Sequence, residues 1–340
     1  MKMRLLPTDD FMHVPEDASN FNESRYYNFF DQGSGFGGWV RMGNRVNEGY
    51  AELTVCLYLP DGSVGFIYDR PKITSNDAHD AGGLRFEVVE PFVRHHVTFE
   101  RKVCLLANPR DMAEPREAFT NNPFVACDLD LVMDAVGPIE GGEPEWEEGD
   151  PQFDLDPERM FARGHTEQHM RVSGTVSVGE ETFALTDGLG MRDHSWGPRY
   201  WQNVWWYRWL TVNLGPNLGM GCTVGGDENG KIGSKGFVYD RARYGDDRFV
   251  PVRRATITSD YDEDFIPRSN TLTVTTDDHV YEVSGEVWSN IPLRNRREGR
   301  TTRITEGATR WTCEGISGTG MSEYLDQIVD GIPVGTEVGH

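Results

Sequence analysis

A carboxylate, an imidazole and two guanidinium groups come together in the octapeptide RDHSWGPR, residues 192–199. Successive side chains of a strand point to opposite faces, so Asp193 and His194 need not touch. Either one could act as a general acid or base, because burial against aromatic rings moves the pKa of a carboxyl or an imidazole towards neutrality. The same stretch could instead be a rigid turn, in which the Gly-Pro pair fixes the backbone and both arginines pair with the aspartate.

A second group of polar residues lies in GHTEQHMR, residues 164–171. His165, Glu167 and His169 alternate there, so on a strand they share one face. Two imidazoles and a carboxylate at this spacing could bind a metal ion, as in facial-triad sites. The same pattern suits a solvent-facing polar side of a strand, or a metal-free polar patch in a cavity. We expect no metal and no cofactor, and we retain Glu167 as a candidate catalytic acid.

Aromatic residues crowd the next stretch, with five tryptophans between residues 196 and 209. Any one of them is most simply a core residue. Their density is better explained by an aromatic wall that lines an apolar ligand cavity. Alternation predicts a strand with Trp205, Tyr207 and Trp209 on one face. We therefore predict that the following residues contact the ligand: Trp196, Arg199, Tyr200, Trp201, Trp205, Tyr207, Trp209 and His169.

Short strands separated by Gly, Asp, Asn and Pro must carry these residues. The segment YAELTVCLYLPDGSVGFIYD, residues 50–69, is typical of a hairpin that turns at its Pro-Asp-Gly. Similar alternation recurs at residues 84–106 and 124–136, and again from residue 165 towards the C-terminus. No long window has a 3.6-residue period. The pattern predicts an all-β protein built from barrels or sandwiches.

One acidic segment rich in Pro and Gly, residues 137–158, interrupts the strand pattern. Its composition is typical of a linker or a long surface loop. We therefore predict two β-rich domains, residues 1–158 and residues 159–340, with RDHSWGPR in the second. The Gly-rich stretch at residues 33–38 is followed by strand-like residues rather than a helix, which argues against a phosphate-binding loop.

Charge and cysteine content narrow the classes of protein. Lys and Arg total 33 against 55 Asp and Glu, which gives a formal net charge of −22. Such a surface repels phosphate backbones and anionic lipids, so we expect neither nucleic-acid binding nor a membrane-surface role. The five cysteines are far apart and form no C-x-x-C pair, which argues against a disulfide framework and a structural zinc site.

The N-terminal residues MKMRLLPTDDFMHVPED lack the apolar core of a signal peptide, and no apolar run approaches the length of a membrane span. We expect a cytoplasmic protein without membrane insertion. The sequence leaves open whether the chain forms a homodimer.

The central motif also carries a family resemblance. Residues 166–199, TEQHMRVSGTVSVGEETFALTDGLGMRDHSWGPR, combine a Glu-Gln strand, an SGTV segment and the pattern G-x-G-x-RDHSWG-x-R. This combination resembles a family related to hydroxyneurosporene synthase (carotenoid 1,2-hydratase) and AttH-like proteins. The segments ESRYYNFF and GGWVRMGNR resemble the start of that family. The carotenoid hydratase itself is only distantly similar.

The resemblance implies two lipocalin-like antiparallel β-barrels packed together, with a ligand cavity between or inside them. Relatives add water to, eliminate water from, cyclise or isomerise apolar terpenoid, polyketide or phenolic molecules without an organic cofactor. A motif shared by such different reactions could also serve to hold the barrels together. The candidate residues carried over by the resemblance are Glu167, Asp193, His194, Trp196 and Arg199.

These observations predict a cofactor-independent lyase or hydratase that acts on a hydrophobic small molecule. Asp193 or Glu167 would protonate an alkene or a leaving hydroxyl, and His194 would orient water or take the second proton. The tryptophan faces would stabilise a developing carbocation. Three alternatives remain: an isomerase or cyclase of the same substrate class, a non-catalytic lipocalin-like carrier, and a metal-dependent enzyme built on His165, Glu167 and His169.

Overall fold

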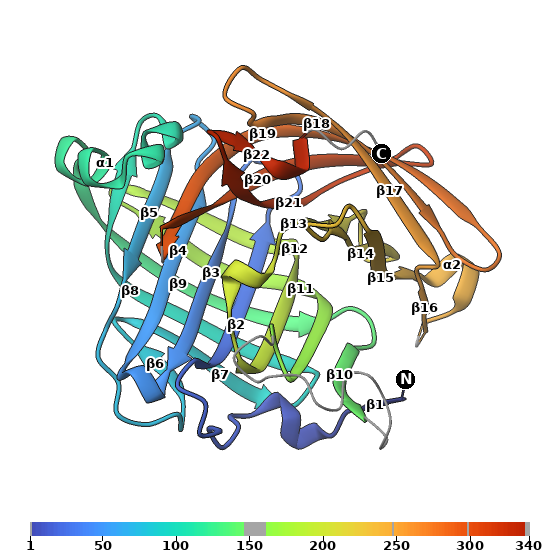
Figure 1. Ribbon diagram of the computed structural model, residues 1–340, viewed down its shortest axis with the longest axis horizontal. Coiled ribbons are helices and arrows are strands. Elements are labelled where there is room, and N and C mark those ends of the chain that lie inside the picture. Colours follow the sequence, from blue (N-terminus) through green and yellow to red (C-terminus); the bar gives the residue numbers. More distant parts are fainter. Residues whose placement is uncertain (1, 146–160, 247, 298, 337–340) are drawn as a thin grey trace.

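Antiparallel strands make up nearly all of the secondary structure in the part of the chain that the structure describes (Figure 1). The computed structural model describes residues 2–145, 161–246, 248–297 and 299–336. None of the helices in these ranges is long and apolar enough to cross a bilayer. The helical elements are α1 (Pro115–Asn121), α2 (Arg241–Tyr244) and 3-10 turns at Pro7–Asp10, Val46–Glu48, Pro109–Ala113, Trp201–Asn203 and Val334–Thr336.

The first sheet has twelve strands and contains a closed barrel. Its ladder runs β11-β12-β2-β3-β4-β5-β8-β9 and closes because β9 pairs with both β8 and β11. The predicted hairpin at residues 50–69 joins β4 and β5. The strands are β1 (Lys2–Arg4), β2 (Phe21–Phe30), β3 (Gly37–Arg45), β4 (Tyr50–Tyr58), β5 (Val64–Asp69), β6 (His79–Ala81), β7 (Leu84–Glu90), β8 (Arg94–Leu106), β9 (Phe124–Ala135), β10 (Glu140–Glu145), β11 (Gly164–Val178) and β12 (Glu181–Pro198).

The second sheet has ten strands in the order β16-β15-β14-β13-β21-β20-β19-β18-β17, with β22 paired to β21. It curls until β17 lies beside β15, where the backbone N–H of Ala255 in β17 donates to the hydroxyl of Ser234 in β15. The predicted all-β architecture of two packed antiparallel barrels is confirmed. The strands are β13 (Trp206–Asn213), β14 (Leu218–Gly226), β15 (Ile232–Asp240), β16 (Phe249–Pro251), β17 (Arg254–Tyr261), β18 (Pro267–Thr275), β19 (Val280–Arg297), β20 (Arg300–Cys313), β21 (Ile316–Val329) and β22 (Ile332–Pro333).

The predicted boundary between residues 158 and 159 does not separate the two sheets. Both β11 and β12 follow that boundary, yet they pair with β9 and β2 in the first barrel. The chain therefore enters the second sheet only after Pro198, and RDHSWGPR belongs to the first barrel. Part of the predicted linker is a strand instead, because residues 140–145 form β10 and pair with β11 in the first sheet. Residues 146–158 of that segment lie outside the described residues.

Each barrel encloses an apolar core, and a third apolar cluster fills the contact between the barrels. Strand β2 shows how the layers connect, because every one of its residues is buried. Tyr27 and Phe29 point into the first barrel, whereas Tyr26 and Phe30 belong to the cluster between the barrels. The barrels thus pack through the outer faces of their sheets. Side chains on those outer faces are the ones that can meet a ligand held between the barrels.

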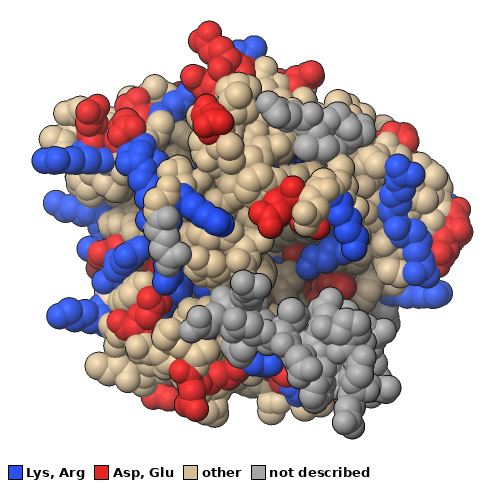
Figure 2. Space-filling model, viewed as in Figure 1, with Lys and Arg blue, Asp and Glu red and all other residues tan. Residues whose placement is uncertain are grey.

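The surface charge is mixed rather than segregated on the face seen in Figure 2, where Lys and Arg lie among Asp and Glu. The strongly negative formal charge of the whole chain therefore does not create a continuous acidic patch on this side of the molecule.

Candidate active site

A cavity of about 490 Å³ lies between the two barrels. Its first wall comes from β2, β3, β4, β5, β11 and β12, and its second from β13, β14, β15, β19, β20 and β21. This volume falls in the range of small-molecule sites. The cavity is therefore open to side chains from both barrels, and neither barrel alone could form it.

Aromatic rings from both barrels line much of this cavity. Tyr26 is central to the packing: its ring stacks on Trp39 at a centroid distance of 5.4 Å and meets Trp209 edge-on at 5.2 Å. Such surfaces favour an apolar ligand and present ring faces to any positive charge that develops on it. The aromatic lining residues are Tyr26, Trp39, Phe66, Tyr68, Phe119, Phe161, Trp201, Tyr207 and Trp209.

A first polar cluster, the His165–Glu167–Asp193 cluster, lines the first-barrel wall. The β11–β12 register sets Glu167 directly opposite Asp193, so their side chains share the face that points at the cavity. The Nε2 of His165 is hydrogen-bonded to Asp193 and lies 3.7 Å from the Oε1 of Glu167. From the other barrel, the indole N–H of Trp209 donates to Oε1 of Glu167 at 2.7 Å.

The surroundings of this cluster shift its proton equilibria. Burial raises the pKa of Glu167 to about 7; the charge of His165 opposes this rise and that of Asp193 adds to it. Burial alone lowers the pKa of His165, but the Asp193 carboxylate reverses the effect, so the net shift is upward. Glu167 can therefore hold or release a proton near neutral pH, which is the property a general acid–base catalyst needs.

A second polar cluster, the Tyr207–Glu306–Glu323 cluster, lies on the second-barrel wall. Glu306 and Glu323 face each other directly across β20 and β21, and the hydroxyl of Tyr207 donates to Glu323. Burial, together with the neighbouring carboxyl of Glu323, holds the pKa of Glu306 well above its usual range. Burial also raises the pKa of Glu323. These upward shifts favour a proton held between the two carboxyls.

The structure brings six of the predicted site residues to the cavity and leaves five outside it. Asp193 and Ser195 face the cavity from β12, whereas the intervening His194 points into the end of the first barrel, as strand alternation requires. The six lining residues are Glu167, Asp193, Arg199, Trp201, Tyr207 and Trp209. The five residues outside are His169, His194, Trp196, Tyr200 and Trp205.

Each of the five outlying residues has a structural explanation. Strand β13 begins at Trp206, so Trp205 lies before the alternating strand and packs against the core of the second barrel. The ring of Tyr200 lies 5.7 Å from the guanidinium of Arg297. His169 follows Glu167 by two residues on β11, the repeat of a strand. Its Nδ1 is hydrogen-bonded to Oδ1 of Asn213 at 2.9 Å. The predicted triad of His165, Glu167 and His169 is therefore split.

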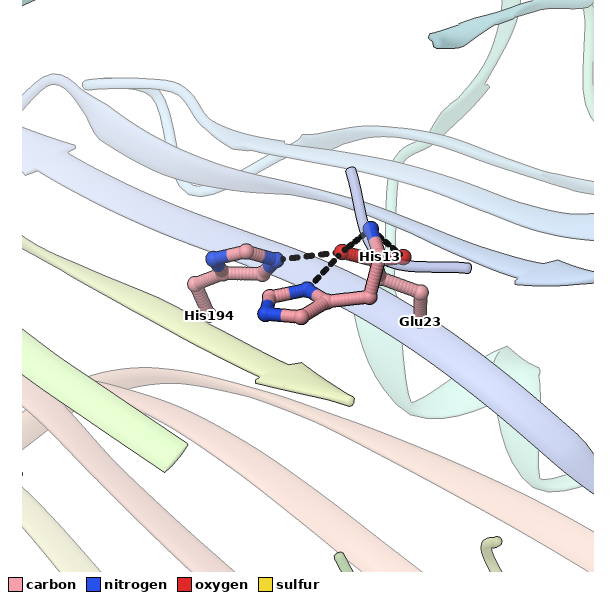
Figure 3. A group of neighbouring side chains, drawn as sticks. All are labelled: His13, Glu23 and His194. Carbon is pink, nitrogen blue, oxygen red and sulfur yellow. Dashed lines mark hydrogen bonds and ion pairs between the residues drawn. The ribbon is translucent and has the colours of Figure 1, made fainter. Parts of the chain in front are cut away.

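His194 belongs to a separate buried cluster, the His13–Glu23–His194 cluster, drawn in Figure 3. Both rings bond to Oε1 of Glu23, at 2.8 Å from His13 Nδ1 and 3.0 Å from His194 Nε2. The other oxygen of Glu23 accepts from the backbone N–H of His13 and from Asn76. Trp196 completes the cluster, since His13 stacks on its ring at 4.1 Å. This cluster fastens the segment before β2 to the end of the first barrel.

The predicted ion-pair network within RDHSWGPR does not form. Arg192 instead pairs with Asp10 at 2.7 Å, deep in the first barrel. Against the effect of burial, His95 and Arg192 hold the pKa of Asp10 well below its usual range. The rigid turn does not form either, because residues 192–198 belong to strand β12. Gly197 instead allows a close approach within that strand: its φ is +110°, and a Cβ there would lie 2.7 Å from the backbone nitrogen of Arg163. The motif thus holds the N-terminal segment with one face and lines the cavity with the other.

Two groups among the described residues have the composition and spacing to hold a metal ion. In the His13–Glu23–His194 cluster, both carboxyl oxygens of Glu23 already accept two donors each. In the His165–Glu167–Asp193 cluster, one ligand atom from each residue lies within 4.8 Å of the others, and the group opens on the cavity. This is the place where a metal would fit, with Asp193 in the role that the sequence suggested for His169.

Sequence reasoning missed several cavity residues. Tyr26, Trp39 and Arg41 lie in the two N-terminal segments that carried the family resemblance, so alternation within those segments could have placed them. Glu306 and Glu323 had no such signal, because only the pairing of β20 with β21 brings them together.

Comparison with known proteins places this architecture in a family. Residues 6–328 match the family described as Domain of unknown function (DUF7064). The chain belongs to the DUF7064 family. No curated protein sequence matches the chain.

Three solved structures share its fold at low sequence identity. A Nitrosomonas europaea protein described as an AttH has 13% identity and a TM-score of 0.56, covering 95% of this chain and 97% of its own. CghA bound to Sch210972 has 11% identity and a TM-score of 0.52, covering 90% and 88%. Kievitone hydratase from Nectria haematococca has 11% identity and a TM-score of 0.53, covering 92% and 90%. The AttH-like fold predicted from the sequence is therefore confirmed.

Proposed function

We propose that this protein is a cofactor-independent hydratase or lyase that moves a proton between Glu167 and an apolar small molecule in the cavity between the barrels. The observation that carries the proposal is the buried carboxyl of Glu167, whose pKa lies at about 7 where it faces an aromatic cavity. The fold shared with kievitone hydratase supports the reaction type by analogy only.

In the hydration direction, the proton of Glu167 passes to one alkene carbon of the substrate and leaves a cation on the other. The aromatic faces around Tyr26 and Trp209 stabilise this cation. Water then adds to the cation, and the proton that water loses passes to the deprotonated Glu167, directly or through His165. His165 is suited to such a relay because its Nε2 lies between Asp193 and Glu167. The reverse sequence eliminates water.

The same acid would also serve an isomerase or a cyclase, in which the cation loses a proton or is captured within the substrate. These reactions differ from hydration only in whether water enters the product. Asp193 acts as a positioning residue that holds the ring of His165, and His194 supports the barrel end from the opposite face of β12.

The test is incubation of the protein with a panel of terpenoid and prenylated phenolic alkenes in water enriched in oxygen-18. Mass spectrometry would show a product that has gained one labelled water if the protein is a hydratase, and an unchanged mass with a new retention time if it isomerises or cyclises. Glu167→Gln should lower turnover about 10²- to 10⁴-fold, whereas Glu282→Gln, the same change at an exposed carboxyl, should not. Compounds that bind but are recovered unchanged from the wild type would instead establish a carrier.

A further inference from the structure

One guanidinium in the cavity lacks an acidic partner. Arg199 is 5% exposed, and its Nη2 donates to the hydroxyl of Ser195 at 2.6 Å. Its Nε is buried and has no hydrogen-bond partner, and no carboxylate in the described part of the chain forms an ion pair with it. The guanidinium lies 4.2 Å from the ring centroid of Phe161 and 5.1 Å from that of Trp201. All four residues in this group line the cavity: Phe161, Ser195, Arg199 and Trp201.

A second guanidinium approaches the same aromatic ring. Arg41 lies 5.9 Å from the centroid of Trp201, so both guanidinium groups converge on that indole. The Nη1 of Arg41 is 3.3 Å from Glu52, but its Nη2 is buried without a partner. Burial, with Arg41 as the next contribution, lowers the pKa of Arg199 to about 10. The surroundings of Arg199 therefore disfavour its positive charge. A negatively charged ligand beside the guanidinium would stabilise that charge.

We propose that Arg199 and Arg41 form a subsite for the carboxylate head of the substrate, whose apolar body extends along the aromatic wall towards Glu167. The proposal rests on the proposed function and adds the substrate class: apolar molecules that carry one carboxylate. The charge balance favours a monoanion, because Glu52 already offsets Arg41 and leaves the charge of Arg199 uncompensated. The two open donors, Arg199 Nε and Arg41 Nη2, suit a group with two oxygens.

The experiment compares ligands that differ only in their heads. Geranic acid and geraniol are titrated at about pH 8, where the acid is ionised, and binding is followed by quenching of tryptophan fluorescence from Trp201 and Trp209. A second pair, 4-phenylbutyrate and 4-phenylbutanol, has a different apolar body. The wild type should bind each acid at least about tenfold more tightly than its alcohol, as a charge-assisted hydrogen bond predicts.

Arg199→Gln should reduce the affinity for both acids to that of the alcohols and leave the alcohols unaffected. Arg294→Gln is the matched control, because Arg294 also lines the cavity but is paired with Glu114 at 2.6 Å; it should keep the preference. The ligand-free Arg199→Gln protein should also unfold at a higher temperature than the wild type, since an uncompensated buried charge has been removed. A merely structural Arg199 would give a lower unfolding temperature.

The proposal is overturned if neither pair shows a preference for the acid, or if Arg199→Gln keeps that preference. Tighter binding of geranyl phosphate than of geranic acid would overturn the assignment of a carboxylate. These outcomes can be told apart from a failure of the proposed function. If turnover depends on Glu167 but acids are not preferred, only the carboxylate subsite is refuted. A preference for acids without turnover would remove the enzyme and leave a binding protein for apolar acids.

Discussion

Two clusters of similar composition lie on opposite faces of β12 and differ in almost every other respect. The His13–Glu23–His194 cluster is closed: four donors occupy the two oxygens of Glu23, and burial, with Arg25 next, depresses the pKa of His194 well below 6.5. The His165–Glu167–Asp193 cluster faces a cavity, and burial raises the pKa of Glu167 to about 7. Histidine and carboxylate side chains therefore hold the chain in place where all their hydrogen bonds are made within the protein. Where they face the cavity, the same side chains can exchange protons with a ligand.

The largest expected effect separates the clusters by function. Glu167→Gln should lower turnover about 10²- to 10⁴-fold, the usual contribution of a general acid, while the protein remains folded. The measurement is the initial rate on the substrate found by the oxygen-18 panel, with circular dichroism as the check on folding. Glu167→Gln protein that keeps the wild-type rate would mean that another group is the acid.

The same substitution at the closed cluster should instead affect folding. Glu23→Gln should lower the free energy of unfolding by about 2–4 kcal/mol, because an amide places donors against the groups that donate to Glu23. Glu167→Gln should leave that free energy nearly unchanged near neutral pH, since an amide resembles the protonated carboxyl that the site already favours. Urea unfolding of both variants tests this, and equal losses of stability would erase the contrast between the clusters.

The two clusters should also respond to pH in opposite directions. Protonated Glu167 is the active form in hydration, so turnover should fall as the pH rises through about 7. On the other face, burial depresses the pKa of His194. Burial also lowers the pKa of His79, whose Nε2 is bonded to the backbone carbonyl of Glu23, to about 3. The unfolded state then binds more protons than the folded state, so stability should be lost as the pH falls below 6.5. Rate and unfolding temperature measured between about pH 5 and 9 would show both trends; a flat stability profile would contradict the second.

The sequence predicted much of the architecture and part of the site for identifiable reasons. Alternation and turn residues indicated β-barrels, and the same alternation correctly set Tyr207 and Trp209 on one face. It also implied that Asp193 and His194 diverge, which the structure bears out in their positions. These are local properties of single strands, and local properties can be read from one segment.

The remaining features depend on pairing between distant segments. Glu306 and Glu323 face each other only when β20 pairs with β21, and Arg41 and Arg199 meet on one indole only when β3 and the segment after β12 come together. The misplaced boundary at residue 158 has the same origin, because composition reveals solvent contact but not which strands will pair.

The smallest expected effect tests how the second barrel adjusts the acid of the first. The indole N–H of Trp209 donates to Glu167 from the opposite wall, and such a bond favours the charged form of a carboxyl. Trp209→Phe keeps a ring beside Tyr26 but removes the donor, so the midpoint of the pH–rate profile should move upward by about 0.5. Tyr207→Phe, which removes a donor to Glu323 instead, is the matched control and should move that midpoint less. If Trp209→Phe moves the midpoint downward, or not at all, the indole acts on the ligand rather than on Glu167, and the two walls of the cavity are chemically independent.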